Sequence, residues 1–317
     1  MLRRNGTTVS FELICEGLQF PEGPIALADG SIVIVEIARG TLTRIAPDGK
    51  ATVVANLGAG PNGAAIGPDG AVYVCNNGGF VWHREPGVTR VIGTPPDYSS
   101  GRIERVDLRT GKFERLYDRC GEQKLNGPND LVFDRHGGFY FTDLGKTYAR
   151  HSDRGVVYYA RADGSMITEV IFPISMPNGI GLSPDEQVLY VNETETGRCW
   201  GYRVFEPGKV ERLPYPSPNG GTLLYGAGGF TRFDGLKCEA DGRVCIATLQ
   251  NGGITTVSPI DGFAEHVPLP DRHTTNLCFA GPDMKTMYVT LSSSGKLIRM
   301  NWPRAGARLN FVDKALV

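Results

Sequence analysis

Short apolar runs rich in β-branched and aromatic residues recur along the chain, and turns built from Gly, Asp and Pro separate them. Examples are SIVIVEI at 31–37, AVYVCNN at 71–77 and VLYVNET at 188–194. Runs of this length and composition are typical of buried β-strands. We find no longer stretch in which apolar residues recur at helical spacing. The pattern therefore predicts a nearly all-β protein.

Six segments share a longer pattern, in which a polar residue begins an apolar strand, a turn residue follows seven positions later, and a second strand follows the turn. The polar first residues, called the hub residues below, are Glu22, Asn62, Asn129, Asn178, Asp234 and Asn276. The turn residues are Asp29, Asp69, His136, Asp185, Asp241 and Asp283. The spacing resembles that of propeller blades, roughly 40–50 residues each. The repeat predicts a six-bladed β-propeller of four-stranded blades, which fills residues 1–317 as a single domain.

The two ends of the chain are expected to complete one blade together. The last repeat has a third strand, GKLIRMNW at 295–302, but no convincing fourth strand after it. The N-terminal stretch TVSFELICEGL at 8–18 resembles the fourth strands of the other repeats. We expect it to close the ring, because closure removes the free edges of an open sheet.

The propeller geometry would bring the hub residues around one axis, since the first strand of each blade lines the central channel. Two carboxylates and four amides without His or Cys form a ligand set suited to a hard cation, with calcium first and magnesium or manganese as alternatives. Asn and Asp also begin strands simply because they make good turns. Asn62 and Asn276 fit that alternative best. The ends of the second strands would supply an outer polar ring of Glu36, Asn76, Asp143, Asn192, Thr248 and Thr290.

Two long connections on the same face are candidates for substrate recognition. The segment 76–102 makes the second repeat longer than the others, so it could form a lid. Its possible substrate contacts are Phe80, Trp82, His83, Arg84 and Tyr98. The Gly-rich segment 216–233 adds Tyr225 and Phe230. The alternative is that these aromatic residues pack the loops onto the propeller. A mouth lined by them would favour a larger or less polar substrate.

The ordered motifs FPEGP (20–24), NGPND (126–130), MPNGIGLSPD (176–185) and FDG (233–235) resemble those of the SMP-30/gluconolactonase family of six-bladed propellers. The resemblance covers nearly the whole chain. It implies a divalent cation held by Glu22, Asn129, Asn178 and Asp234, with calcium as the first choice and Mg²⁺, Mn²⁺ or Zn²⁺ as alternatives. It also implies hydrolysis of a lactone. Animal members contact the sugar through an Arg at the position of Gly127, and this chain lacks that contact.

Lactone hydrolysis requires a polarised carbonyl and an activated water, and a cation can supply both. Asp234 is the first candidate for the catalytic base, with Asp143 and Glu36 as alternatives. Asn129 could both bind the cation and orient the substrate, with Asn62, Asp143, Glu36, Trp82, Arg84, Tyr98 and Phe230 as further substrate contacts. Three other functions remain open: a metal-dependent arylesterase or phosphotriesterase-like hydrolase, a non-catalytic ligand-binding propeller, and a metal-free propeller enzyme of the strictosidine-synthase type.

The composition narrows the choice of partners. The 33 basic and 34 acidic residues nearly cancel, so no long-range field favours nucleic acid or a membrane surface. Gly58, Gly60 and Gly63 match a dinucleotide motif but precede a strand instead of a helix. The chain has no G-x-S-x-G elbow and no His pair at zinc spacing. Seven Cys without C-x-x-C, and no apparent signal peptide or membrane span, predict reduced thiols and a cytoplasmic monomer or weak homo-oligomer that binds a small molecule.

Overall fold

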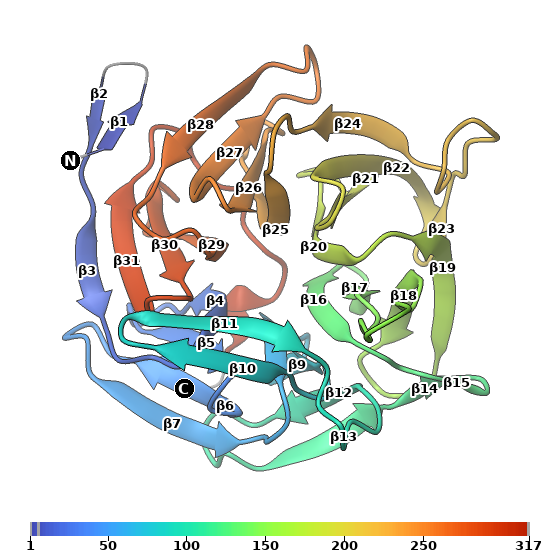
Figure 1. The fold of residues 1–317 in the computed structure, drawn as a ribbon, viewed down its shortest axis with the longest axis horizontal. Helices are drawn as coiled ribbons and strands as arrows, with labels where there is room; N and C mark the ends of the chain where they lie inside the picture. Colours follow the sequence, from blue (N-terminus) through green and yellow to red (C-terminus); the bar gives the residue numbers. More distant parts are fainter. Residues whose placement is uncertain (1, 5–6, 316–317) are drawn as a thin grey trace.

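The computed structural model describes residues 2–4 and 7–315. Within them, six antiparallel sheets surround a central axis as the blades of a propeller (Figure 1). The innermost strand of each blade contacts the innermost strands of its two neighbours, which closes the ring. These six strands are β4 (Pro21–Ala26), β8 (Pro61–Ile66), β16 (Pro128–Phe133), β20 (Pro177–Leu182), β25 (Arg232–Cys238) and β29 (Thr274–Ala280).

Three further strands complete each blade in antiparallel order toward the outside. The second strands are β5 (Ile32–Glu36), β9 (Val72–Asn76), β17 (Gly138–Asp143), β21 (Val188–Glu193), β26 (Val244–Leu249) and β30 (Thr286–Leu291). The third strands are β6 (Thr41–Ile45), β12 (Arg102–Val106), β18 (Gly155–Arg161), β22 (Arg198–Glu206), β27 (Gly253–Val257) and β31 (Lys296–Asn301). The outer strands are β7 (Ala51–Asn56), β13 (Phe113–Tyr117), β19 (Ile167–Ile174), β24 (Thr222–Gly226), β28 (Ala264–Pro268) and β3 (Glu12–Cys15). The all-β prediction and the number of blades are confirmed.

The N-terminal strand closes the ring as the sequence predicted. Strand β3 pairs with β31 in an antiparallel register that places Leu13 opposite Ile298. The sixth blade is therefore built from both ends of the chain, which removes the open edge that β31 would otherwise present.

The remaining elements are short and lie outside the four-stranded blades. The segment 76–102 contains an antiparallel hairpin, β10 (Val81–Glu85) and β11 (Val88–Gly93), which crosses in front of the first blade in Figure 1. The hairpin lies between β9 and β12 along the chain, which explains the long second repeat. The other short elements are β1 (Leu2–Arg4), β2 (Thr7–Val9), β14 (Arg119–Cys120), β15 (Gln123–Lys124), β23 (Lys209–Val210) and the 3₁₀ turn η1 (Val312–Lys314).

The core lies between neighbouring blades, because both faces of most inner and second strands are covered. All five residues of β5 and all six of β17 are buried. Glycines let the inner strands approach closely at the hub. A Cβ added to Gly63 would come within 2.4 Å of the Asn129 carbonyl oxygen, and one added to Gly179 within 2.4 Å of the Asp234 carbonyl oxygen. This close packing holds the hub residues of adjacent blades side by side.

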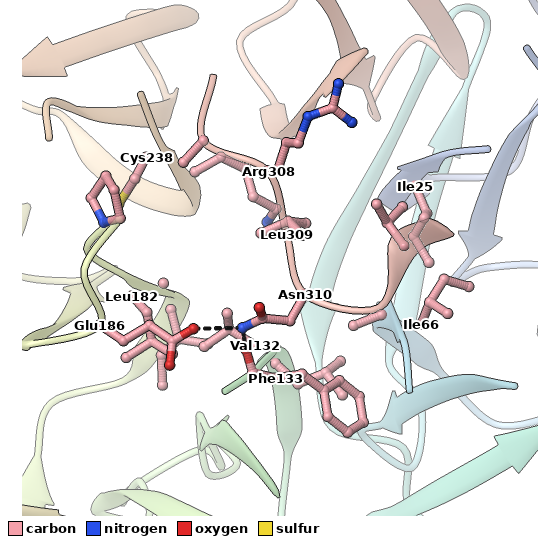
Figure 2. A pocket seen from close by; sticks show the side chains of 18 of the residues that line it. Ile25, Ile66, Val132, Phe133, Leu182, Glu186, Cys238, Arg308, Leu309 and Asn310 are labelled. Atoms are coloured by element: carbon pink, nitrogen blue, oxygen red, sulfur yellow. Dashed lines mark hydrogen bonds between the residues drawn. The ribbon is translucent and has the colours of Figure 1, made fainter. Parts of the chain in front are cut away.

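A cavity of about 370 Å³, called the rear cavity below, lies at the ends of the inner strands farthest from the hub residues. Apolar residues such as Ile66 and Val132 line it together with the C-terminal segment 307–312 (Figure 2). Asn310 fixes that segment, since its amide nitrogen donates to Glu186 Oε1 at 2.7 Å and to the Phe133 carbonyl at 3.1 Å.

All seven cysteines are free thiols, and six of them are buried. Among the residues that the structure describes, no helix has the length and apolar character required to cross a membrane.

Candidate functional site

The structure brings five of the six hub residues into the lining of one cavity of about 350 Å³, called the hub cavity below. All five are at most 8% exposed. They are Glu22, Asn62, Asn129, Asn178 and Asp234, each from a different inner strand. Asn276 is buried next to them, and its amide nitrogen donates a hydrogen bond to Glu22 Oε2 at 2.8 Å. Asn276 therefore positions Glu22 without lining the cavity itself.

The two hub carboxylates lie in an environment that disfavours their negative charge. Burial raises the pKa of Glu22 to about 7, and the negative charge of Asp130 adds to this effect, while hydrogen bonds from Asn276 and Gly23 oppose it. Burial also raises the pKa of Asp234 well above its usual value, and the charges of Glu22 and Asp130 raise it further. Protein carboxylates collected in this way are stabilised in their charged form by a cation.

The residues of the hub cavity fit a hard divalent cation. Glu22 and Asp234 supply carboxylate oxygens, and Asn129 and Asn178 supply amide oxygens. Asn178 uses its amide nitrogen to donate to Thr194 Oγ1 at 3.1 Å, which leaves its oxygen for another partner. Within the described residues no group of three or more His, Cys, Asp or Glu side chains could hold a metal. A cation at the hub therefore depends on amide oxygens, as calcium sites commonly do.

An ion pair lies beneath the hub residues and was not predicted from the sequence. Lys237 Nζ lies 3.6 Å from Asp130 Oδ2 and donates to the Leu236 carbonyl at 3.0 Å and to Asn276 Oδ1 at 3.3 Å. Lys237 also lines the rear cavity, so it stands between the two ends of the channel. The repeat contained a signal for Asp130, because four of the other five inner strands have Gly at this position: Gly23, Gly63, Gly179 and Gly235.

The outer-ring carboxylates hold loops, and the structure does not bring them into the hub cavity. Asp143 accepts hydrogen bonds from the backbone N–H groups of Asn126 and Gly127 at 2.7 and 2.6 Å. Burial raises the pKa of Asp143, and these backbone hydrogen bonds oppose the shift. Glu36 accepts from the Gln19 N–H at 2.7 Å and pairs with Arg39 at 2.9 Å. Each carboxylate thus fixes the connection that leads into its inner strand.

The fourth blade uses a different residue for this purpose than the sequence suggested. Strand pairing places Glu193 opposite Pro177, as Glu36 is opposite Pro21. Glu193 accepts a hydrogen bond from the Ser175 N–H at 3.1 Å. The outer-ring member of the fourth blade is therefore Glu193, not Asn192, because the longer turn of this blade shifts the register by one residue.

Four expected substrate contacts from the long connections are not part of the lining of the hub cavity, and three of them, Trp82, Arg84 and Tyr98, contact other segments instead. The Trp82 ring lies 5.0 Å from the Phe20 ring and 5.9 Å from the Phe80 ring. Arg84 donates to the Ala38 carbonyl at 3.3 Å. The Tyr98 hydroxyl donates to the Asn126 carbonyl. Phe230 is 71% exposed, and its ring lies 5.6 Å from the Arg232 guanidinium.

Lys146 lines the hub cavity and was missed by the sequence analysis. Its Nζ donates to the Gly79 carbonyl at 2.8 Å and lies over the rings of Phe80 and Tyr98, at 4.4 and 4.9 Å from their centres. Burial lowers its pKa to about 8, although the charges of Asp143 and Asp153 oppose the shift. Lys146 thus joins the third blade to the base of hairpin β10–β11. Nothing in the sequence pattern distinguishes it from a surface lysine.

Two apolar residues of the cavity lining also escaped prediction. Phe20 and Met176 immediately precede the inner-strand prolines Pro21 and Pro177, and both line the hub cavity. Their φ angles are +58° and +43°, a region that non-glycine residues seldom adopt. Backbone strain of this kind often accompanies functional sites. The local sequence contains no glycine at these positions and did not reveal the positive φ angles.

The fold and the site together define a class of protein: a six-bladed β-propeller with carboxylates and amides converging in a buried hub. A family model described as SMP-30/gluconolactonase/LRE-like region matches residues 20–293, and the chain belongs to this family. The resemblance noted from the sequence motifs is therefore confirmed.

Two curated relatives illustrate the similarity in sequence. A lactonase drp35 from Staphylococcus haemolyticus is 30% identical over 241 residues, which cover 75% of this chain and 66% of that protein. A gluconolactonase from Zymomonas mobilis is 25% identical and is matched over 91% of this chain and 80% of its own length. The chain thus spans slightly under two thirds of the staphylococcal relative and more of the second one.

Solved structures share the fold at lower identity. A gluconolactonase from Xanthomonas campestris superimposes with a TM-score of 0.73 at 21% identity, over 93% of this chain and 90% of that one. A calcium-binding protein, regucalcin from Agrobacterium tumefaciens, gives a TM-score of 0.72 at 19% identity, over 95% and 96% of the two chains.

Proposed function

We propose that the protein is a divalent-cation-dependent lactonase whose active site is the hub cavity. The observation that carries the proposal is the convergence of two buried carboxylates, Glu22 and Asp234, with the amides of Asn129 and Asn178 in one cavity. The raised pKa values of both carboxylates support a site built for a cation. The lactonase and gluconolactonase relatives support lactone hydrolysis as the reaction.

The proposed roles follow from the positions of the side chains. Glu22, Asn129, Asn178 and Asp234 hold the cation, with calcium as the first choice. A bound divalent cation would polarise the lactone carbonyl and lower the pKa of a nearby water. Asp234 accepts the proton of the attacking water. Asn129 and Asn62 orient the substrate within the hub cavity. Asn276 positions Glu22 through its 2.8 Å hydrogen bond.

Glu36 and Asp143 are weaker candidates for the base because backbone N–H groups already occupy their carboxylates. Asp234 is a better choice than Glu36 or Asp143 because it lines the cavity, although Asn178 and the Gly235 backbone also hydrogen-bond to its carboxylate. A carboxylate with a pKa closer to neutrality is a better general base, although a bound cation would lower that pKa again.

A pH-stat assay over a panel of lactones, aryl esters and phosphotriesters, with and without EDTA, tests the proposal. We expect turnover of at least one lactone, loss of this activity with EDTA, and recovery on addition of excess Ca²⁺, Mg²⁺, Mn²⁺ or Zn²⁺. Turnover of only aryl esters or phosphotriesters would move the assignment to the alternative hydrolase. Cation binding without turnover of any compound would indicate that the protein is a non-catalytic, ligand-binding propeller.

We propose further that the protein acts in the cytoplasm on a small molecule, as a monomer or weak homo-oligomer, without nucleic acid or membrane. The seven free thiols support a reducing compartment, because secreted proteins usually pair their cysteines. Cell fractionation and sedimentation analysis of the purified protein would test the location and the oligomeric state.

A further inference from the structure

The hub cavity has two chemically different parts. Its floor carries five of the hub residues, all except Asn276, and the hydroxyls of Thr194 and Thr275. The rest of the lining combines the polar residues Lys146, Glu195, Arg232 and His273 with an apolar surface, called the wall below, which includes Phe20, Phe80, Val91, Ile92, Met176 and Leu249. A ligand whose ester lies at the hub residues would therefore also contact an apolar surface that includes Val91 and Ile92.

The hairpin supplies the outermost part of this wall. Val91 and Ile92 of β11 are 39% and 60% exposed although they are apolar and line the cavity. Exposed apolar side chains around a concave site are typical of surfaces that bind apolar ligands. No interior packing requires Ile92 to be apolar, since most of its surface is exposed to solvent.

Several contacts hold the wall in place over the floor. The Thr89 N–H donates to the Ser293 carbonyl at 2.9 Å, which attaches β11 to the sixth blade. Arg84 attaches β10 to the first blade through the Ala38 carbonyl. Lys146 binds the Gly79 carbonyl at the base of the hairpin. The wall therefore belongs to the site in its resting arrangement, and its chemistry bears directly on the substrate.

A polyhydroxylated sugar lactone does not match this wall. Each hydroxyl placed against Val91, Ile92 or Met176 would lose its water partners without gaining a hydrogen bond, which costs free energy. Of the charged residues elsewhere in the lining, Lys146 donates to the Gly79 carbonyl and Arg232 donates to Glu195, so these groups are already engaged within the protein.

We propose that the preferred substrates are lactones with an apolar substituent of several carbons. This inference rests on the lactonase function proposed above. The hub residues hold the ester end of the substrate at the floor, and the hairpin wall binds the substituent. Hydrolysis adds water across the ring ester, so the product is a hydroxy acid whose hydrocarbon tail lies against β11.

The test is a series of δ-lactones with unbranched alkyl chains of increasing length, compared with glucono-δ-lactone under identical conditions. We expect kcat/KM to rise with each added methylene until the wall is covered. The largest expected increase in kcat/KM is roughly fourfold per methylene, because burying one methylene group contributes about 0.8 kcal/mol. A flat series, or a preference for glucono-δ-lactone over every alkyl lactone, would overturn the inference.

Two variants locate the effect. Ile92→Ser should lower kcat/KM for the longest lactone by roughly five- to twentyfold, while the lactone without a substituent changes less than twofold. Ile260→Ser is the matched control, because Ile260 is 90% exposed and is not part of the cavity lining. It should change neither value. An equal loss on both lactones in Ile92→Ser would contradict the wall's role and indicate a structural effect.

If Ile92→Ser proves poorly folded, Val91→Thr provides a nearly isosteric replacement with the same expected direction. Failure of the inference is distinguishable from failure of the proposed function. In the first case the wild-type protein hydrolyses lactones without regard to chain length. In the second case it hydrolyses no lactone at all.

Discussion

The two cavities at opposite ends of the channel are similar in volume but differ in chemistry. The hub cavity holds about 350 Å³ and contains two buried carboxylates and three amides. The rear cavity holds about 370 Å³, and Ile66, Val132 and Leu182 contribute to its apolar lining (Figure 2). Volume therefore does not distinguish the site. What distinguishes the hub cavity is its pair of buried carboxylates with raised pKa values, because strongly shifted pKa values within a cavity are typical of functional sites.

The inner strands contribute residues to both cavities. Each inner strand has its hub residue at the second or third position, and residues farther along, such as Ile25 and Val132, line the rear cavity. Lys237 and Asp130 form the boundary between the two environments.

Asp234→Asn should produce the largest effect, because it removes one of the two carboxylates that define the hub. We expect lactone turnover to fall by roughly 10³-fold, comparable to the loss of a group that stabilises the transition state directly. The thermal unfolding curve of the chelated protein should stay cooperative. Asp241→Asn, in the exposed turn of the same blade, is the matched control. Near-normal turnover in Asp234→Asn would remove Asp234 from the mechanism.

Lys237→Met should remove the ion pair that separates the hub cavity from the rear cavity. Removing the ammonium leaves Asp130 buried without its nearest cation, and breaking such a pair costs about 3 kcal/mol. Denaturant unfolding of the chelated protein should report this loss of unfolding free energy. The double variant Asp130→Asn with Lys237→Met should recover part of it. A loss below about 1 kcal/mol in the single variant would show that the pair is not important for stability.

Removal of the cation should destabilise the protein in a pH-dependent way. The pKa of folded Glu22 is about 7 against an ordinary value of 4.5, so the chelated protein loses stability as the pH rises from 4.5 through 7. A cation opposes this loss, because it stabilises the charged carboxylates. At a concentration 100 times its Kd, the cation should raise the free energy of unfolding by about 2.7 kcal/mol near pH 8. The increase should be distinctly smaller near pH 5, where Glu22 is protonated. Thermal melts with Ca²⁺ and with EDTA at both pH values provide the measurement, and an equal shift at both would argue against the hub as the binding site.

Asn310→Ala should affect stability alone. The variant loses the hydrogen bonds to Glu186 and Phe133, which hold the C-terminal segment over the rear cavity. We expect a loss of about 1 kcal/mol in unfolding free energy and unchanged kcat/KM, since the hub lies at the other end. A marked fall in turnover in this variant would connect the rear cavity to the reaction.

The sequence predicted the repeated part of the molecule well. The polar first residues, the turns seven positions later and the strand runs recur six times, so the pattern identified the blades, the closing strand and the convergence of the hub residues. The assignment of residues 1–317 to a single domain remains a prediction. The repeat even contained evidence for Asp130, which replaces a glycine found in four other blades.

The parts that the sequence did not predict depend on contacts between segments that do not repeat. Hairpin β10–β11 occurs in one blade, and its position over the cavity depends on Ser293 and Ala38, which lie far away in the sequence. The strand pattern cannot distinguish Asp143 from an acidic residue that lines the cavity. In the structure, the carboxylate of Asp143 accepts hydrogen bonds from backbone N–H groups instead. Lys146 lies in the cavity because the rings of Phe80 and Tyr98 surround it, and no periodicity encodes that packing.

Calorimetric titration of Ca²⁺, and in parallel Mg²⁺, Mn²⁺ and Zn²⁺, into the chelator-stripped protein tests the central claim most directly. Our account predicts that at least one of these ions binds with a stoichiometry near one and releases protons at pH 6–7, where Glu22 would give up its proton. It also predicts that Glu22→Gln and Asp234→Asn each weaken binding severely, whereas Asn310→Ala does not. Absence of binding by all four ions, or binding that survives both hub substitutions unchanged, would contradict the account.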